Sequence, residues 1–280
     1  MGYYSIDNLY KNQDIFLFKE CYAMEKIHGT SAHIGIKDGR INLFSGGVQG
    51  EIFAQLFDID KLLAELLVIT PDITIYGEAY GGKCQGMSKV YGKELKFVAF
   101  EVRIGYNWLN VPAAEDIVKG VGLEFVDYVR IPVEIDPYLD AERLRDSSQA
   151  IRNGMGEGHL REGIVCRPLI EVTKNNGARI IVKYKNEEFQ ETKKKREIGK
   201  DKLKILTKAE DIAAEWATEM RLTHILGNYS EIPSIEHTGE VVKLMLADIE
   251  KESIGEIEWN HEARKAIGKV TAAMFKTRLF

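Results

Sequence analysis

Lys26 lies in a short segment, Glu25 to Gly29, where a β-rich run meets a turn. The flanking runs 16–18 and 32–36 are both rich in β-branched and aromatic residues, so we expect Lys26 at the end of a strand. Gly29 is expected to take the positive φ that such a turn needs. An amine fixed in this way is a candidate covalent nucleophile. Because a lone Lys beside His and Gly is more often a solvated turn, the assignment depends on residues further along the chain.

Two lysines and two glutamates in the later part of the chain could complete a phosphate site. Lys183 and Lys185 alternate in a β-rich run, which puts both on one strand face with Tyr184 on the other. Glu78 and Glu162 each adjoin a glycine, where backbone can approach a ligand closely. Taken singly, such residues are usually surface cations and solvated turn glutamates.

The order of these segments resembles a known family. Lys26-Ile27-His28-Gly29 resembles motif I, Lys-x-(Asp/His)-Gly, of the covalent nucleotidyltransferases, and its His form is similar to the RNA ligase 2 family of ATP-dependent RNA ligases. Four further family motifs are matched in order, and together they span residues 25–186: Gly77-Glu78, the run 97–102 that carries Phe100, the run 162–168 that begins Glu162-Gly163, and Lys183-x-Lys185.

The resemblance implies ATP-dependent joining of RNA ends in three steps. Lys26 attacks the α-phosphate of ATP and becomes a lysyl-AMP, with loss of pyrophosphate. AMP then passes to an RNA 5′-phosphate, and an RNA 3′-hydroxyl attacks that phosphate and releases AMP. Lys26 must lose its proton to attack, and Lys183, Lys185 and a divalent ion would favour the neutral amine.

The resemblance also implies roles for individual residues. Lys183 and Lys185 hold phosphate oxygens, and Glu162 helps to hold a catalytic Mg²⁺ or Mn²⁺. Glu78 contacts the ribose or the RNA end, and His28 serves the later steps at the RNA ends. The remaining expected nucleotide contacts come from Glu25, which reads the base, from Phe100, which stacks on adenine, and from Ile27 and Gly29.

Composition is compatible with this class. The chain has 280 residues, a net charge of −5 and three widely spaced cysteines, which argues against a disulfide framework and fits a reducing, cytoplasmic location. We expect RNA as the partner and no association with membranes. The acidic balance argues against coating by nucleic acid over the whole surface, but a local basic groove is enough, and the run 193–196 is a candidate.

The periodicities predict two domains. Residues 1–197 are expected to form an α+β nucleotidyltransferase domain of antiparallel sheets with flanking helices, similar to the ATP-grasp-like adenylylation domain of ligases. It should contain a 32–44 hairpin with an Asp-Gly turn, strands at 95–104 and 124–133, helices at 60–68, 113–119 and 140–153, and an exposed loop at 80–94. Residues 198–280 are expected to be all helical, with helices at 207–226, 240–253 and 261–278.

Two alternatives stay open at this point. A DNA ligase or a capping enzyme would normally carry Asp in place of His28 and an OB-fold after Lys185, which the helical C-terminal pattern opposes. A catalytically inactive RNA-binding relative would keep the fold without the chemistry. The chain also has Ser45-Gly46-Gly47 where many relatives carry a basic residue, so Arg40, Lys83 and Lys89 are candidate substitutes. The preference for nicked duplex or single strands and the oligomeric state are not decided by the sequence.

Overall fold

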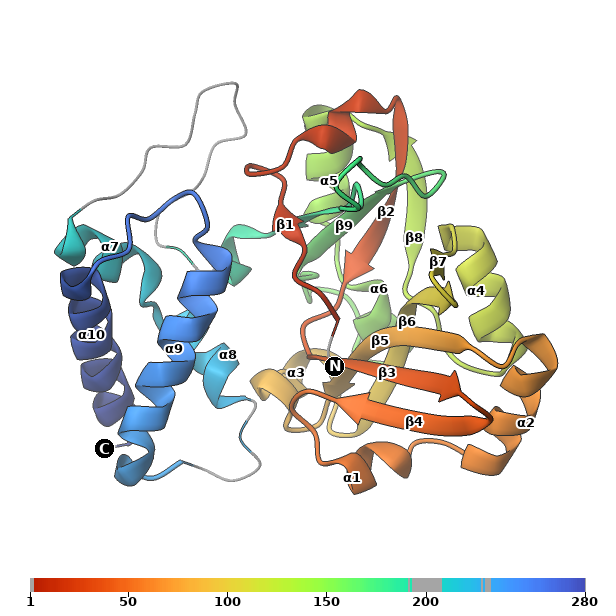
Figure 1. Cartoon of the computed structure of the whole chain (residues 1–280), viewed down its shortest axis with the longest axis horizontal. Coiled ribbons are helices and arrows are strands. Elements are labelled where there is room, and N and C mark those ends of the chain that lie inside the picture. Colours follow the sequence, from red (N-terminus) through yellow and green to blue (C-terminus); the bar gives the residue numbers. More distant parts are fainter. Residues whose placement is uncertain (1–2, 191, 193–207, 228, 230–232, 280) are drawn as a thin grey trace. The chain divides into compact units, whose positions relative to one another are not determined.

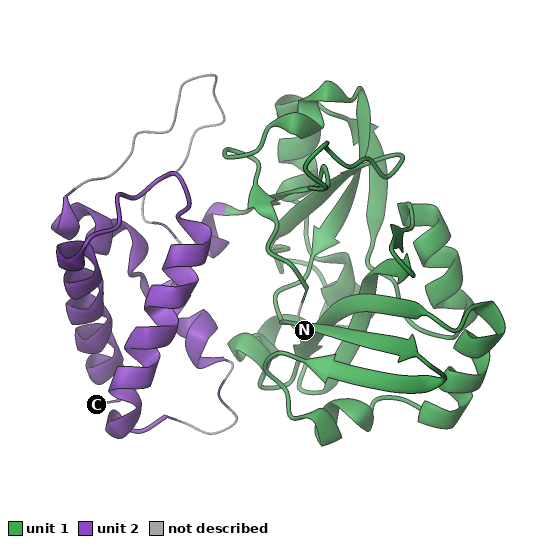
Figure 2. Cartoon of the chain, in the orientation of Figure 1, with its two compact units in different colours: residues 1–186 green, residues 187–280 purple. Residues whose placement is uncertain are grey.

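The computed structural model describes residues 3–190, 192, 208–227, 229 and 233–279. The chain divides into two compact units, which we call unit 1 (1–186) and unit 2 (187–280) (Figure 2). The domain boundary expected near residue 198 and the basic run 193–196 both lie outside the described residues.

Unit 1 is built on two five-stranded sheets, as the α+β expectation requires (Figure 1). In the first, which we call sheet A, all neighbours are antiparallel except the parallel pair β1–β10. Its strands, in spatial order, are β1 (Asp7–Asn8), β10 (Val182–Lys185), β9 (Gly163–Pro168), β2 (Glu20–Lys26) and β8 (Tyr128–Pro132).

The second sheet, sheet B, is antiparallel throughout and contains the expected Asp-Gly hairpin. Asp38 and Gly39 both have positive φ, 51° and 71°, as a two-residue type I′ turn demands. The strands, in spatial order, are β4 (Arg40–Ser45), β3 (Thr30–Lys37), β5 (Ile73–Gly81), β6 (Leu95–Ile104) and β7 (Asn107–Trp108).

Helices cover one face of sheet B and bury its apolar side chains. Ile34, Ile75 and Val102 from the strands pack with Phe53, Leu66 and Ala114 from the helices in the main core of unit 1. The helices concerned are α1 (Gly50–Ala54), α2 (Ile59–Ile69) and α4 (Val111–Gly120). The opposite face of sheet B is left for polar and aromatic residues.

A buried ion network connects the two sheets. Glu101 of β6 is only 1% exposed, and it pairs with Arg167 of β9 at 3.0 Å and with Arg179 at 2.5 Å. Both arginines also bind Glu171. A carboxylate shared by two buried arginines keeps its charge balanced away from water, so the network fixes sheet A relative to sheet B.

Four of the segments expected in unit 1 differ from the structure, and the first three differences are confined to the ends or the type of one segment. Residues 16–18 do not form a strand, because η1 (Asp14–Leu17) precedes β2. Segment 80–94 is not an exposed loop: β5 runs to Gly81, and η2 (Cys84–Gly86) and α3 (Ser88–Tyr91) follow with Tyr91 buried. The expected strand 124–133 starts late, at Tyr128. The other short helical segments are η3 (Ile135–Leu139), α5 (Asp140–Arg143), α6 (Ser148–Arg152) and, at the start of unit 2, η4 (Glu187–Phe189).

The fourth, the expected helix 140–153, is broken between α5 and α6 by tertiary contacts. Asp146 forms a β-bridge with Leu160, and the Ser147 amide donates to His159 O at 2.6 Å. Because residues 146 and 147 pair with residues 159 and 160, their backbone does not continue the hydrogen bonding of an α-helix. The Ser147 side chain then caps α6.

The secondary-structure elements named in the described part of unit 2 are all helices. A single core holds its helices together and includes Trp216, Leu222, Met245, Ile267 and Phe275. The expected helix 207–226 is interrupted at Ala217 and Thr218, and Thr218 caps the second piece. The elements are α7 (Ala209–Trp216), α8 (Glu219–Leu226), η5 (Ile235–His237), α9 (Thr238–Glu252) and α10 (His261–Leu279).

A search of the described helices for one long and apolar enough to cross a bilayer finds none.

Candidate active site

Glu162 is the centre of the candidate site. One of its oxygens, Oε2, lies 2.8 Å from Lys26 Nζ and 3.3 Å from His28 Nδ1, and the other, Oε1, lies 3.0 Å from Lys185 Nζ. The carboxylate is 1% exposed. The structure therefore brings together four of the residues that the sequence singled out for chemistry.

The strand register explains this convergence. Gly163 of β9 pairs with Lys26 of β2 on one side and with Lys185 of β10 on the other, so the two lysines flank the same point of sheet A. Glu162 directly precedes Gly163. A Cβ on Gly163, whose φ is +153°, would lie 2.3 Å from Tyr184 O, so only glycine allows the strands to approach this closely.

The surrounding charges determine the ionisation of Glu162. Burial is the largest single influence and opposes ionisation, but the neighbouring Lys26, Lys185 and His28 outweigh it. Together they hold the pKa of Glu162 well below its usual value of 4.5. Near neutral pH the site thus carries a buried negative charge that contacts Lys26, His28 and Lys185.

Lys183 and Lys185 occupy one face of β10, as the alternation predicted. Both are buried, 8% and 7% exposed, whereas Tyr184 points the other way and donates to Asp140 at 2.7 Å. Arg143 stacks on the Tyr184 ring at 4.4 Å and donates to Lys185 O at 3.2 Å. These contacts with α5 fix the end of β10.

Asn186 connects the two strands that carry Glu162 and Lys185. Its side-chain amide donates to Arg143 O and Arg161 O, each at 3.0 Å, and its backbone N–H donates to Glu162 O at 2.8 Å. No sequence signal marked Arg143 as a positioning residue, and the position of Asn186 directly after Lys185 was the only hint for Asn186.

Gly29 and Glu78 meet at the turn after Lys26, but not for the reason expected. Gly29 is not among the glycines with positive φ, so that expectation is wrong. A Cβ on Gly29 would instead lie 2.3 Å from Ala79 O and 2.9 Å from Glu78 Cγ. Glycine is required there because β5 passes close by, and this passage brings Glu78 next to the segment that carries Lys26.

Glu25 and Ile27 point away from Lys26. Glu25 is buried, accepts from Ser147 Oγ at 2.5 Å and from Gln149 N at 3.2 Å, and so anchors α6. Burial raises the pKa of Glu25, although the Ser147 hydrogen bond opposes this. Ile27 packs in the main core, 4% exposed. In this structure the expected base-reading carboxylate is held by α6.

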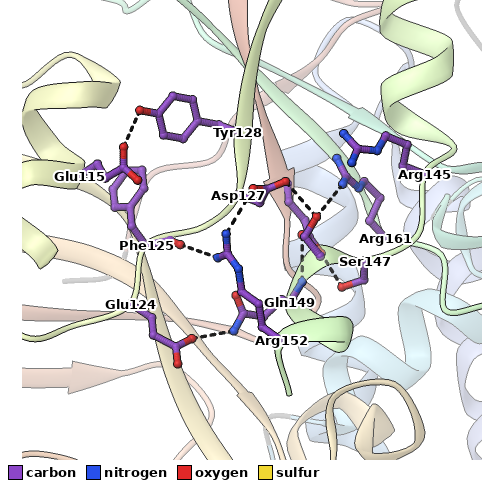
Figure 3. Close-up of polar contacts among 12 residues, drawn as sticks. Glu115, Glu124, Phe125, Asp127, Tyr128, Arg145, Ser147, Gln149, Arg152 and Arg161 are labelled. Carbon is purple, nitrogen blue, oxygen red and sulfur yellow. Dashed lines mark hydrogen bonds and ion pairs between the residues drawn. The ribbon is translucent and has the colours of Figure 1, made fainter. Parts of the chain in front are cut away.

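Figure 3 shows how α6 is fixed to the segment that precedes β8. Gln149 donates to Glu124 at 2.7 Å, and Arg152 donates to Phe125 O at 2.9 Å and to Asp127 at 3.2 Å. The Asp127 carbonyl in turn accepts from the Glu25 amide at 2.8 Å, next to Lys26. Helix α6 and the segment before β8 thus fix the last residues of β2.

Phe100 lies apart from the charged cluster, on sheet B. Its ring meets the ring of Tyr3 edge-on, with 5.0 Å between centroids, and it is half-buried. Tyr3 also donates through its backbone N–H to Ser31 Oγ at 3.3 Å and through its hydroxyl to Glu101.

The donor chemistry around Glu162 fits a divalent cation of the magnesium type. Mg²⁺ is commonly held by one or two carboxylates, with waters and substrate phosphates completing the shell. Glu162 supplies one ionised carboxylate, and among the described residues its Oε1 accepts no hydrogen bond beyond the ion pair with Lys185. In the described part of the chain, no three His, Cys, Asp or Glu side chains cluster around one point.

Comparisons with known proteins identify the class. The family model described as RNA ligase matches residues 19–185, more than half of the chain, and this range includes each residue of the Glu162 cluster. The chain belongs to the RNA ligase family. A search of curated proteins finds no match.

Solved structures similar to this chain include those of an RNA ligase from Naegleria gruberi. A mutant with ATP and Mn is 15% identical, with a TM-score of 0.53 over 68% of this chain and 57% of that chain. The same ligase with PPi is also 15% identical, with a TM-score of 0.52 and the same coverage. The present chain therefore matches a little over half the length of these structures. At this identity the likeness shows the fold, and it confirms the expected α+β architecture.

Proposed function

We propose that this chain is an ATP-dependent RNA ligase that joins RNA 3′-hydroxyl and 5′-phosphate ends through a lysyl-AMP on Lys26. The observation that carries the proposal is the convergence of Lys26, His28 and Lys185 on the buried carboxylate of Glu162. Membership of the RNA ligase family and the fold shared with ligases solved with ATP and Mn support it.

In the first step, Lys26 Nζ forms a bond to the α-phosphorus of ATP, and the bond to the pyrophosphate oxygen breaks. Lys183 and Lys185 then face the phosphate oxygens on which charge accumulates. Glu162 would hold the divalent cation, which supplies charge neutralisation for those oxygens. The ion pair of Glu162 with Lys26 positions the ammonium, and Lys26, whose side chain is 23% exposed, loses its proton to solvent before the attack.

In the second step, an oxygen of the RNA 5′-phosphate attacks the AMP phosphorus, and the bond to Lys26 Nζ breaks. In the third, the RNA 3′-hydroxyl attacks the activated 5′-phosphorus, and AMP leaves with the bonding electrons. We assign His28 to these later steps. Its Nδ1 lies 3.3 Å from Glu162 Oε2, the oxygen that also contacts Lys26 Nζ, so the ring lies beside the proposed nucleophile. Phe100 and Glu78 are proposed to contact adenine and the ribose or RNA end. We assign unit 2 to docking of the RNA.

Joining of labelled RNA strands tests this function directly. Wild-type protein should convert 3′-hydroxyl and 5′-phosphate ends into a longer strand with ATP and Mg²⁺, and not with GTP. A strand with a 5′-hydroxyl is the matched control and should not be joined. Joining that needs GTP, or RNA binding without any joining, would contradict the proposal and favour the capping-type or the inactive alternative.

A further inference from the structure

A continuous row of aromatic rings crosses sheet B. It begins at Phe100 on β6 and ends at Phe44 on the edge strand β4. Successive ring centroids are 5.0 Å apart for Phe100 and Tyr3, 5.3 Å for Tyr3 and Tyr76, 5.6 Å for Tyr76 and His33, and 5.0 Å for His33 and Phe44. The last two rings are stacked, with 20° between their planes. We call these five residues the aromatic row.

The row lies on the face of sheet B that the helices leave uncovered. His33 pairs with Tyr76 and with Phe44 across the sheet, and Ser31 pairs with Glu78. Residues opposite one another, or two apart along a strand, share a face. The row therefore shares its face with Glu78, next to the Lys26 turn, and leads from there to the edge of the sheet.

One cationic group on this face, the Arg103 guanidinium, suits an anionic ligand. Arg103 lies over the rings of Trp108, at 5.5 Å, and Tyr76, at 5.9 Å, and it forms no ion pair within the described residues. Its buried Nε also has no hydrogen-bond partner there. The nearby carboxylate of Glu101 is already paired with Arg167 and Arg179.

The rings at the outer end of the row are not sealed in the core. His33, Phe44 and Arg103 are all half-buried, and β4 has no further strand beside it in sheet B. Burial also lowers the pKa of His33, so near neutral pH its planar ring is uncharged. Flat rings beside a guanidinium that carries no ion pair are the parts that proteins use to hold single-stranded nucleic acid.

We propose that the aromatic row binds the single-stranded RNA that leads away from the joining site, with an unpaired base stacked on Phe44 and His33 and a phosphate on Arg103. The choice of RNA rests on the proposed function. Stacking is tolerant of sequence because every base presents a π-face. The site would therefore retain an RNA end without selecting its bases.

Fluorescence of 2-aminopurine in a single-stranded RNA tests the proposal, because this base is quenched when it stacks. Wild-type protein should bind the RNA and quench the probe. Phe44→Ala should weaken binding about tenfold and abolish the quenching, whereas Phe44→Tyr, which keeps a ring, should restore both. Arg103→Gln should lower the slope of log affinity against log salt by about one.

Tyr106→Ala is the matched control, because Tyr106 is 97% exposed in the β6–β7 turn and lies outside the row. It should behave as wild type. The proposal is overturned if Phe44→Ala binds and quenches as wild type does, if Tyr106→Ala loses as much as Phe44→Ala, or if fully duplex RNA binds as tightly and depends equally on Phe44.

The fold of each variant is checked by thermal melting and by labelling of Lys26 with ATP, which no row variant outside Phe100 should change. His33→Ala is the second variant if Phe44→Ala fails to fold, and the same loss of quenching is expected. Quenching by a wild-type protein that never becomes labelled with ATP would contradict the proposed ligase function and leave the RNA-binding row standing.

Discussion

At the residue scale, the candidate site depends on one buried carboxylate that neutralises several cationic groups. Glu162 sits between Lys26 and Lys185, whose side chains are 23% and 7% exposed. A buried carboxylate is tolerated only while its partners remain, and the same holds for each buried ammonium. Stability and chemistry at this site are therefore linked through the charge of Glu162.

We expect Glu162→Gln to lower the free energy of unfolding by about 3 kcal/mol at neutral pH, because the buried ammonium of Lys185 loses its ion pair with Glu162. The variant should also lose adenylylation. Glu20→Gln is the control, since Glu20 lies on the same sheet and pairs with Arg130 at the surface. Urea unfolding should show a change of less than about 1 kcal/mol for that exposed pair.

The sign of the pH dependence follows from the lowered pKa of Glu162. In the unfolded chain this group takes up a proton near 4.5, whereas in the folded protein it does so only at a much lower pH. Its contribution to stability is therefore complete above about 4.5 and is lost as the pH falls through the folded pKa. Acid titration of unfolding should show a smaller loss in Glu162→Gln than in wild type; equal losses would contradict the assignment.

His28→Ala should separate the steps of the reaction. We expect labelling by ATP to fall less than tenfold and RNA joining to fall more than about a hundredfold, in line with the usual effect of losing an acid–base group. Single-turnover rates of labelling and of joining measure the two steps on the same preparation. Equal losses in both would remove the role that we assign to His28.

At the scale of elements, the site is made by the adjacent strands β2, β9 and β10 and by the helices that hold their ends. Gly163 sits between Lys26 and Lys185 in the sheet register. Helix α6 holds the end of β2 through Glu25, and α5 holds the end of β10 through Arg143. The geometry of the candidate site thus follows from strand contacts more than from the Lys26 turn.

Gly163→Ala should disrupt this geometry. A Cβ would overlap Tyr184 O at 2.3 Å, so β9 and β10 must separate and carry Glu162 away from Lys185. We expect a loss of about 2–4 kcal/mol in unfolding free energy, typical of a severe steric change, and at least a tenfold loss of labelling. Gly120→Ala at the end of α4, where a Cβ meets nothing within 4 Å, is the matched control and should be nearly neutral.

Local sequence patterns correctly predicted the elements that depend on contacts between residues close in sequence. The Asp38-Gly39 hairpin, β6 and the long helices α9 and α10 were all expected from turn chemistry or periodicity. The break between α5 and α6 was not, because it depends on the bridge of Asp146 to Leu160 and on the Ser147 contact to Glu25. Such partners lie too far apart in sequence for a local pattern to show them.

The same limit applies to the site. The motif order indicated Lys26, Glu162 and Lys185 as partners, and the structure brings them together. Glu25 points toward α6, and the side-chain amide of buried Asn186 donates to Arg143 O. Both arrangements depend on tertiary packing. The family resemblance identified the charged groups, but not the residues that hold them in place.

At the scale of the whole molecule, the residues of the Glu162 cluster all belong to unit 1, and unit 2 has its own core. We expect a fragment of residues 1–186 to keep labelling by ATP within about tenfold of the full chain, because the contacts of Glu162 with Lys26, His28 and Lys185 and the register of the strands that carry them are internal to it. RNA joining should fall much further, because the fragment lacks the unit to which we assign docking of the RNA.

Labelling and joining by the fragment and the full chain, at matched protein concentrations, measure this division. The fragment with Lys26→Ala is the control for background labelling, and circular dichroism melting establishes that the fragment is folded. A folded fragment that joins RNA as well as the full chain does would contradict the role of unit 2.

The most direct test of Lys26 as the nucleophile is to incubate the protein with Mg²⁺ and ATP labelled at the α-phosphate, denature it, and map the label by mass spectrometry of its peptides. We expect one AMP per chain, bound to Lys26, absent from Lys26→Ala and not formed from GTP. A well-folded protein that takes no label from ATP, or takes it at a residue other than Lys26, would contradict the central claim that Lys26 is the nucleophile.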